Sequence, residues 1–187
     1  MCGIVGIYLK TKKFEKNLGK MLSGMLNNME SRGPDSAGFA IYKNSDKKEY
    51  KYSLCINNLD FNKFKKDISK KIRNLKLNQY SDHIIVKTPE IPKKFIKFIN
   101  KEFPEVSVVG YGHSIEIFKQ VGNPKDVVKK FNLESFSGTH GIGHTRMATE
   151  SAITTDGSHP YSTGEDECLV HNGCLLYTSP SPRDGFT

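Results

Sequence analysis

The second residue of the chain is a cysteine, and its position offers chemistry that an internal cysteine lacks. Removal of Met1, which is common before a small residue, would leave a thiol and a free α-amine on Cys2. An α-amine and a thiol titrate in the same range, at roughly pH 8, so the amine can serve as the base for its own nucleophile. The alternative is a small buried apolar residue, which position alone favours.

Three further segments carry the groups that an acyl transfer at Cys2 would need. Residues 31–38 (SRGPDSAG) form a polar, glycine-rich turn that contains Arg32. Arg146 stands near the end of a predicted strand, where its guanidinium could bind a substrate carboxylate in a fork. Asn172 and Gly173 follow another strand and offer an amide side chain and a backbone N–H, the parts of an oxyanion hole.

Each of these groups has a simpler interpretation. Arg146 could form a surface ion pair with Glu150, and Asn172-Gly173 could be an ordinary turn. One chain is unlikely to carry all of these groups for unrelated reasons. We therefore expect some of them to share a site.

The segments MCGIVGIY, SRGPDSAGFAIY, GIGHTRMATES, SHPYSTGED and LVHNG resemble the signature segments of class II glutamine amidotransferases. They occur in the family order between residues 2 and 173, and the combination is far more specific than any one motif. The resemblance implies an enzyme that hydrolyses glutamine to glutamate and ammonia. It also implies an α+β fold, the four-layer αββα sandwich of N-terminal-nucleophile hydrolases with antiparallel sheets, here expected to be incomplete because the family continues beyond Gly173.

The resemblance assigns roles to particular residues. Cys2 would be the nucleophile, and Asn172 and the N–H of Gly173 would hold the tetrahedral oxyanion. Arg146 would bind the α-carboxylate of glutamine, with Thr149 nearby.

Two further residues complete the expected site. Arg32 would brace the loop that carries Cys2. His159 lies in a segment that matches the pocket of the family, and both a substrate-binding role and a packed core histidine remain open for it. No metal ligand set and no cofactor are expected in this chain.

Within the family, the segments RGPDSAGFA, HTRMATES and HPYSTGED are most similar to glutamate-synthase-type glutaminase subunits. Members that make glucosamine phosphate usually have Trp where Met147 stands, and members that make phosphoribosylamine usually read RGQ at residues 32–34. The expected partner is therefore a separate synthase subunit, plausibly flavin-dependent, that receives the ammonia. The alternatives are the glutaminase of another synthase, such as one for asparagine, and an inactive relative that acts only as a binding module.

Charge and composition restrict the other classes of function. The formal net charge is +8, and residues 43–133 carry 20 Lys+Arg against 10 Asp+Glu. The chain has only four arginines, whereas specific phosphate and base contacts favour arginine, so nucleic-acid binding is not expected. The chain has no apolar run of about 18 residues and no signal-peptide pattern, and its four cysteines form no CxxC pair, so we expect a reduced, cytoplasmic protein without membrane contact.

Apolar periodicity predicts the elements that must position these groups. Strands are expected at 2–9, 37–43, 50–56, 83–87, 138–148 and 167–173, with a pair over 106–121 broken at 110–112. Amphipathic helices are expected at 14–30, 61–77, 92–103 and from 123 onwards. We therefore expect one glutaminase domain over residues 1–173, and a tail at 174–187 that is rich in Ser, Pro and Gly and matches nothing in the family.

Overall fold

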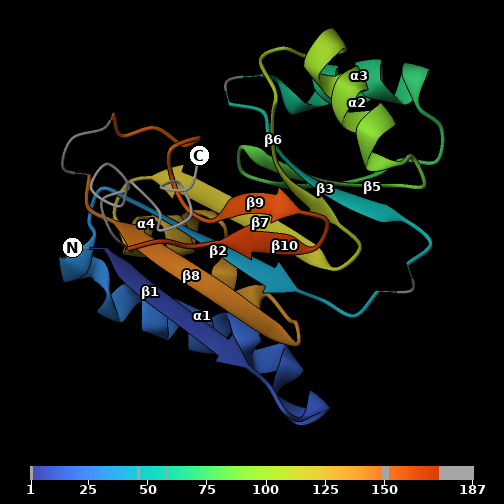
Figure 1. The fold of residues 1–187 in the computed structure, drawn as a ribbon. Coiled ribbons are helices and arrows are strands. Elements are labelled where there is room, and N and C mark those ends of the chain that lie inside the picture. Colours follow the sequence, from blue (N-terminus) through green and yellow to red (C-terminus); the bar gives the residue numbers. More distant parts are fainter. Residues whose placement is uncertain (1, 46, 58, 149–151, 173–187) are drawn as a thin grey trace, which may run out of the picture.

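A computed structural model describes residues 2–45, 47–57, 59–148 and 152–172 (Figure 1). Within these ranges the chain forms four α-helices, short 3₁₀ turns and three antiparallel sheets. This is the α+β class with antiparallel sheets that the sequence predicted. The expected tail at 174–187 lies outside the described residues.

The first sheet holds the N-terminus and the strand that ends at Arg146. Its strand order is β1-β8-β2-β7 and every pair is antiparallel. The bounds are β1 Gly3–Tyr8, β8 His140–Arg146, β2 Ser36–Tyr42 and β7 Ile115–Val121. Two helices, α1 (Leu18–Asn28) and α4 (Pro124–Lys130), cover one face of this sheet (Figure 1).

Helix α1 packs on the sheet because Leu18, Leu22 and Leu26 recur every fourth residue and fall on one face. All three are essentially fully buried, against Phe39 of β2 and other apolar side chains. The 3₁₀ turns η1 (Lys12–Asn17) and η2 (Glu30–Arg32) flank α1. The sequence predicted one helix over 14–30, whereas the α-helical part is limited to its middle.

The second sheet belongs to a continuous segment, residues 50–112, that we call the module. Its elements are β3 (Tyr50–Cys55), α2 (Phe61–Lys71), β4 (Lys76–Tyr80), β5 (His83–Thr88), α3 (Pro92–Glu102) and β6 (Ser107–Gly112). The strand order β4-β5-β3-β6, antiparallel throughout, is that of the split β-α-β, or ferredoxin-like, arrangement.

Both helices of the module cover the same face of its sheet. Phe64 and Ile68 of α2 and Phe95 and Ile99 of α3 meet Tyr52 and its neighbours in a core of their own. The opposite face packs on the first sheet through a smaller apolar cluster: Ala40, Cys55, Val109, Ile115 and Ile117. The layers therefore run helices, sheet, sheet, helices (Figure 1), which is compatible with the αββα arrangement expected.

A two-stranded hairpin lies beside the first sheet and the module. It consists of β9 (Tyr161–Gly164) and β10 (Glu167–Leu169), and β9 also approaches β6 of the module. The 3₁₀ turn η3 (Leu133–Ser135) packs on α1 instead. The hairpin matters for the site because the chain leaves β10 directly toward Asn172.

The face of the first sheet away from α1 is open in part. Ile4 and Tyr8 of β1 are 43% and 73% exposed, and a groove there is lined by Tyr8, Tyr42, His140 and Cys168 among others. The described residues thus leave apolar side chains of β1 uncovered.

Several sequence-based boundaries require correction. The strands expected at 37–43 and 50–56 are β2 and β3, and although they follow one another in the chain they belong to different sheets. The break within 106–121 lies after Gly112, not at 110–112, and it separates the two sheets. The helix predicted over 61–77 ends at Lys71, and residues 76–80 form the unpredicted strand β4, whose Leu77 packs against the core of the module.

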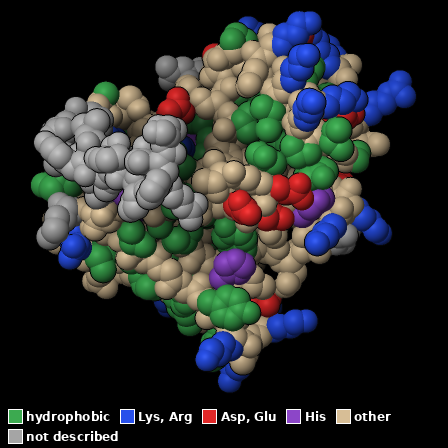
Figure 2. Space-filling view, in the orientation of Figure 1, with side chains coloured by type: hydrophobic (Ala, Val, Ile, Leu, Met, Phe, Trp, Pro, Cys, Tyr) green, Lys and Arg blue, Asp and Glu red, His purple; other side chains and the backbone are tan. Residues whose placement is uncertain are grey.

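The lysine excess lies largely over the module. Figure 2 shows Lys and Arg side chains gathered over the part of the molecule where α2 and α3 lie. Lys70 pairs with Asp67 and Lys94 with Glu90, all within the module. This mixed pairing fits a solvated helical surface. No helix among the described residues is both long and apolar enough to cross a membrane.

Candidate active site

The carbonyl oxygen of Cys2 is the point where three distant segments of the chain meet. Asn172 donates to it from Nδ2 at 3.1 Å, and Arg32 donates to it from Nε at 3.4 Å. The Sγ atom of Cys2 lies 4.0 Å from the carbonyl oxygen of Met147. Cys2 is partly exposed, and its thiol forms no disulfide with the described residues.

Strand register explains why Cys2 and Arg146 are neighbours. In the antiparallel pair of β1 and β8, Gly3 stands opposite Thr145. If the same antiparallel register is continued by one residue, Cys2 lies opposite Arg146. Arg146 is only 9% exposed, and its Nη1 donates to the carbonyl oxygen of Ala152 at 3.3 Å.

The turn that carries Arg32 lies directly on the end of β8. A Cβ atom at Gly33 would lie 2.4 Å from the carbonyl carbon of Thr145, so only glycine allows this approach. The next acidic residue, Asp35, accepts from the N–H of Ala148 at 2.7 Å and donates its own N–H to the carbonyl oxygen of Arg146 at 3.1 Å. The segment 31–38 therefore fixes both Arg32 and the chain that leaves β8.

Two histidines form a second layer behind Asn172. The rings of His144 and His159 lie 4.1 Å apart between centroids, and His159 also contacts Tyr161 edge-on. The Nε2 atom of His144 lies 2.9 Å from the carbonyl oxygen of His171, which makes Nε2 the protonated nitrogen if His144 is neutral. This contact fixes the residue just before Asn172.

Both rings favour the neutral state. Burial lowers the pKa of His159 to about 3, and the charges of His144 and Arg146 add to the effect. Burial also lowers the pKa of His144, although its contact with the carbonyl of His171 works in the other direction. Near neutral pH the pair is therefore uncharged, which suits a packing and orienting role.

The structure brings together most of the residues predicted from the sequence. Cys2, Arg32 and Asn172 are in direct contact, and Arg146 is adjacent through the strand register. Among the described residues, His159 packs on His144, which in turn contacts the residue before Asn172, so the packed-histidine interpretation fits its surroundings. The positions of Thr149 and Gly173 lie outside the described residues.

Sequence reasoning missed three residues that hold this arrangement. Asp35 and His144 lie inside the quoted motifs, but their roles depend on partners 113 and 27 residues away. Asp166 was not selected either, although it joins the hairpin to the module. The polar motif STGED was the only signal in the sequence for it.

Known proteins provide an independent comparison. No protein-family profile matches the chain. The glutamine amidotransferase-like protein GlxB of Rhizobium meliloti (strain 1021) is 45% identical over 178 residues, which cover 94% of this chain and 59% of that protein. A relative from Methanothermobacter thermautotrophicus is 32% identical over 187 residues, covering 92% of this chain and 61% of that protein.

Shorter matches include glutamine–fructose-6-phosphate aminotransferases. That of Methanococcus maripaludis is 41% identical over 63 residues, 33% of this chain and 10% of that protein. By contrast, the match to GlxB covers 94% of this chain. The uncovered part is much shorter than the module, so most of the module lies within the match to GlxB.

This chain spans about three fifths of the length of the first two relatives. Over that span, the similarity to glutamine amidotransferases and the meeting of Cys2, Arg32 and Asn172 identify the chain as a homologue of the class II glutamine amidotransferases.

Proposed function

We propose that the protein hydrolyses glutamine to glutamate and ammonia, with Cys2 as an N-terminal nucleophile. The observation that carries the proposal is the convergence of Asn172 and Arg32 on Cys2, beside the buried strand end that holds Arg146. The names of the relatives agree with this activity.

In the proposed reaction, the thiolate of Cys2 attacks the side-chain amide carbon of glutamine. The α-amine freed by loss of Met1 takes the thiol proton and delivers it to the leaving ammonia. Asn172 Nδ2 and the N–H of Gly173 then donate to the developing oxyanion. Water hydrolyses the γ-glutamyl thioester and releases glutamate.

For substrate recognition we propose Arg146 and Thr149. Arg146 would bind the α-carboxylate of glutamine, for which its guanidinium fork is well suited. Thr149 would lie in the same pocket, and His159 would support the site indirectly by packing on His144. Arg32 would keep the Cys2 carbonyl in place, as its present contact suggests.

For the ammonia acceptor, we infer a separate, flavin-dependent synthase subunit of the glutamate-synthase type. The segments RGPDSAGFA and HTRMATES support that branch, while the matches to glucosamine-forming aminotransferases cover only about a third of the chain. We also propose that the protein works in the reducing environment of the cytoplasm, because a thiol nucleophile must stay reduced.

The test combines intact mass with activity. The protein would be treated with a diazo-ketone analogue of glutamine, and a Cys2→Ala variant would serve as the control. We expect one adduct on the wild type, with Met1 absent, no adduct on the variant, and release of glutamate from glutamine by the wild type alone. A folded wild type lacking Met1 that takes no adduct and releases no glutamate would refute the proposal, and would leave a binding module as the better description.

A further inference from the structure

We propose that Asp166 is a positioning residue that ties the β9–β10 hairpin to the β6–β7 connection, where the module joins the first sheet, and thereby places Asn172 against Cys2. The inference rests on the proposed function, because it concerns the geometry of the same oxyanion site. It also gives the module a role, because the end of β6 and the connection that follows it support the chain that enters the site.

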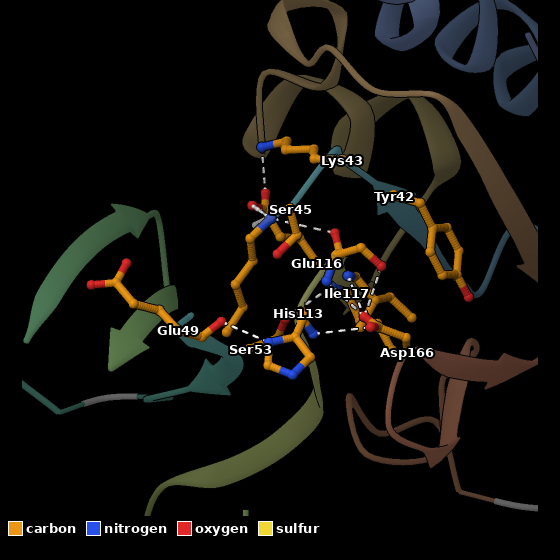
Figure 3. A network of polar contacts seen from close by, with 12 residues as sticks. Tyr42, Lys43, Ser45, Glu49, Ser53, His113, Glu116, Ile117 and Asp166 are labelled. Atoms are coloured by element: carbon orange, nitrogen blue, oxygen red, sulfur yellow. Dashed lines mark hydrogen bonds and ion pairs between the residues drawn. The ribbon is translucent and has the colours of Figure 1, made fainter. Parts of the chain in front are cut away.

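Asp166 occupies the tight turn between β9 and β10 and has a left-handed backbone, with a φ of 57°. Its carboxylate caps the β6–β7 connection. It accepts from the N–H of His113 at 3.1 Å, of Ser114 at 2.7 Å and of Ile115 at 2.9 Å, and from the Ser114 hydroxyl at 2.8 Å. Figure 3 shows the carboxylate directed at the turn that carries His113.

These four donors make the contact strong and specific. Partial burial opposes ionisation of Asp166, but the surrounding N–H groups of Ser114, Ile115 and His113 hold its pKa below the usual value. Hydrogen bonds to a charged acceptor are stronger than neutral ones. The hairpin is therefore held by a carboxylate that stays ionised at neutral pH.

The module is shaped to receive this turn. The N–H of Asp166 donates to the carbonyl oxygen of Tyr111 at 3.1 Å. A Cβ atom at Gly112 would lie 2.2 Å from Oδ1 of Asp166 and 2.5 Å from its nitrogen. Any side chain at Gly112 would thus force the hairpin away, although Gly112 lies far from the site in the sequence.

From Asp166 the chain runs directly into the site. Only five residues separate it from Asn172, and the path between is fixed at two points. Cys168 Sγ lies 3.5 Å from the Tyr42 hydroxyl, and the His171 carbonyl accepts from His144 at 2.9 Å. A displacement of the hairpin would therefore move the amide of Asn172 relative to Cys2.

Two variants perturb this contact from opposite sides. Asp166→Asn removes the charge and places an amide group among four donors, whereas Gly112→Ala leaves Asp166 intact and pushes it away. Glu167→Gln is the matched control, since it changes a neighbouring carboxylate that takes no part in the cap. Thermal unfolding and the hydrogen exchange of α1 would show that each variant is folded.

For both variants we expect kcat for glutamine hydrolysis to fall by about tenfold or more, with KM changed by less than about threefold, because a misplaced oxyanion donor weakens transition-state binding. The double variant should lose little more than either single one, since both break the same contact. Backbone amides of residues 167–172 should exchange faster, while iodoacetamide should still alkylate Cys2 at the wild-type rate.

A folded Asp166→Asn protein with unchanged kcat and unchanged exchange at 167–172 would overturn the inference. A loss of thermal stability with no change in kcat or in exchange would also overturn the inference, because a residue with a purely structural role would give that result. If the wild type does not hydrolyse glutamine, the proposed function fails, and the exchange measurement alone decides whether Asp166 positions the strand.

Discussion

The side chain of Asn172 donates to the backbone carbonyl of Cys2 across 170 residues of sequence, at 3.1 Å. This contact brings together the two ends of the part of the chain that the structure describes.

Asn172→Ala should lower kcat for glutamine hydrolysis by about 10² to 10³, the usual loss for one oxyanion donor, with a much smaller effect on KM. Steady-state glutamate release measures this. Asn78→Ala, on the exposed face of β4, is the control. Equal activity of the wild type and Asn172→Ala would show that Asn172 does not serve the reaction.

Arg32→Lys should reduce the turnover of the proposed reaction even though the charge is kept. Lysine lacks the planar guanidinium that reaches the Cys2 carbonyl from Nε. Arg73→Lys is the matched control, because Arg73 lies on the exposed surface of the module. The rate of labelling by the diazo-ketone reports the effect, and identical rates for Arg32→Lys and Arg73→Lys would argue against a bracing role.

Gly33→Ala should destabilise the protein and abolish labelling of Cys2, because the added methyl group meets the backbone of Thr145 at 2.4 Å. Gly24→Ala is an instructive control. Gly24 lies within α1 and a Cβ there has open space, so the substitution should stabilise the protein by about 0.4–1 kcal/mol. Urea unfolding measures both, and a Gly33→Ala protein as stable as the wild type would contradict the close packing of this turn.

Acid should destabilise the protein through His159. Its pKa is about 3 in the folded state and near its usual value when unfolded, so the unfolded chain binds the extra proton between these limits. The free energy of unfolding should therefore be unaffected by His159 above about pH 6.5 and fall below it, by at most about 1.4 kcal/mol per pH unit.

The comparison of wild type with His159→Gln isolates this contribution. Urea unfolding between pH 4 and pH 7 should give a shallower slope for the variant, because a glutamine cannot take up the proton. Parallel pH dependences for the two proteins would mean that His159 is not held neutral in the folded state.

The sequence by itself indicated the protein family and determined much of the local structure. The type and position of Cys2, together with the motifs around Arg32, Arg146 and Asn172, indicated the glutamine amidotransferases before any contact was known. The apolar spacing of Leu18, Leu22 and Leu26 likewise predicted the helix that covers the first sheet. Such signals are local, since they depend on residue type and on the period of one element.

The tertiary structure alone decided how distant segments meet. That β2 and β3 enter different sheets, and that residues 50–112 fold as a separate module, depends on which strands pair, and pairing is a non-local choice that alternating patterns leave open. The support of Asn172 by His144 and Asp166 is equally non-local. Those contacts join residues 27 to 53 positions apart in the sequence, and only packing brings them within hydrogen-bonding distance.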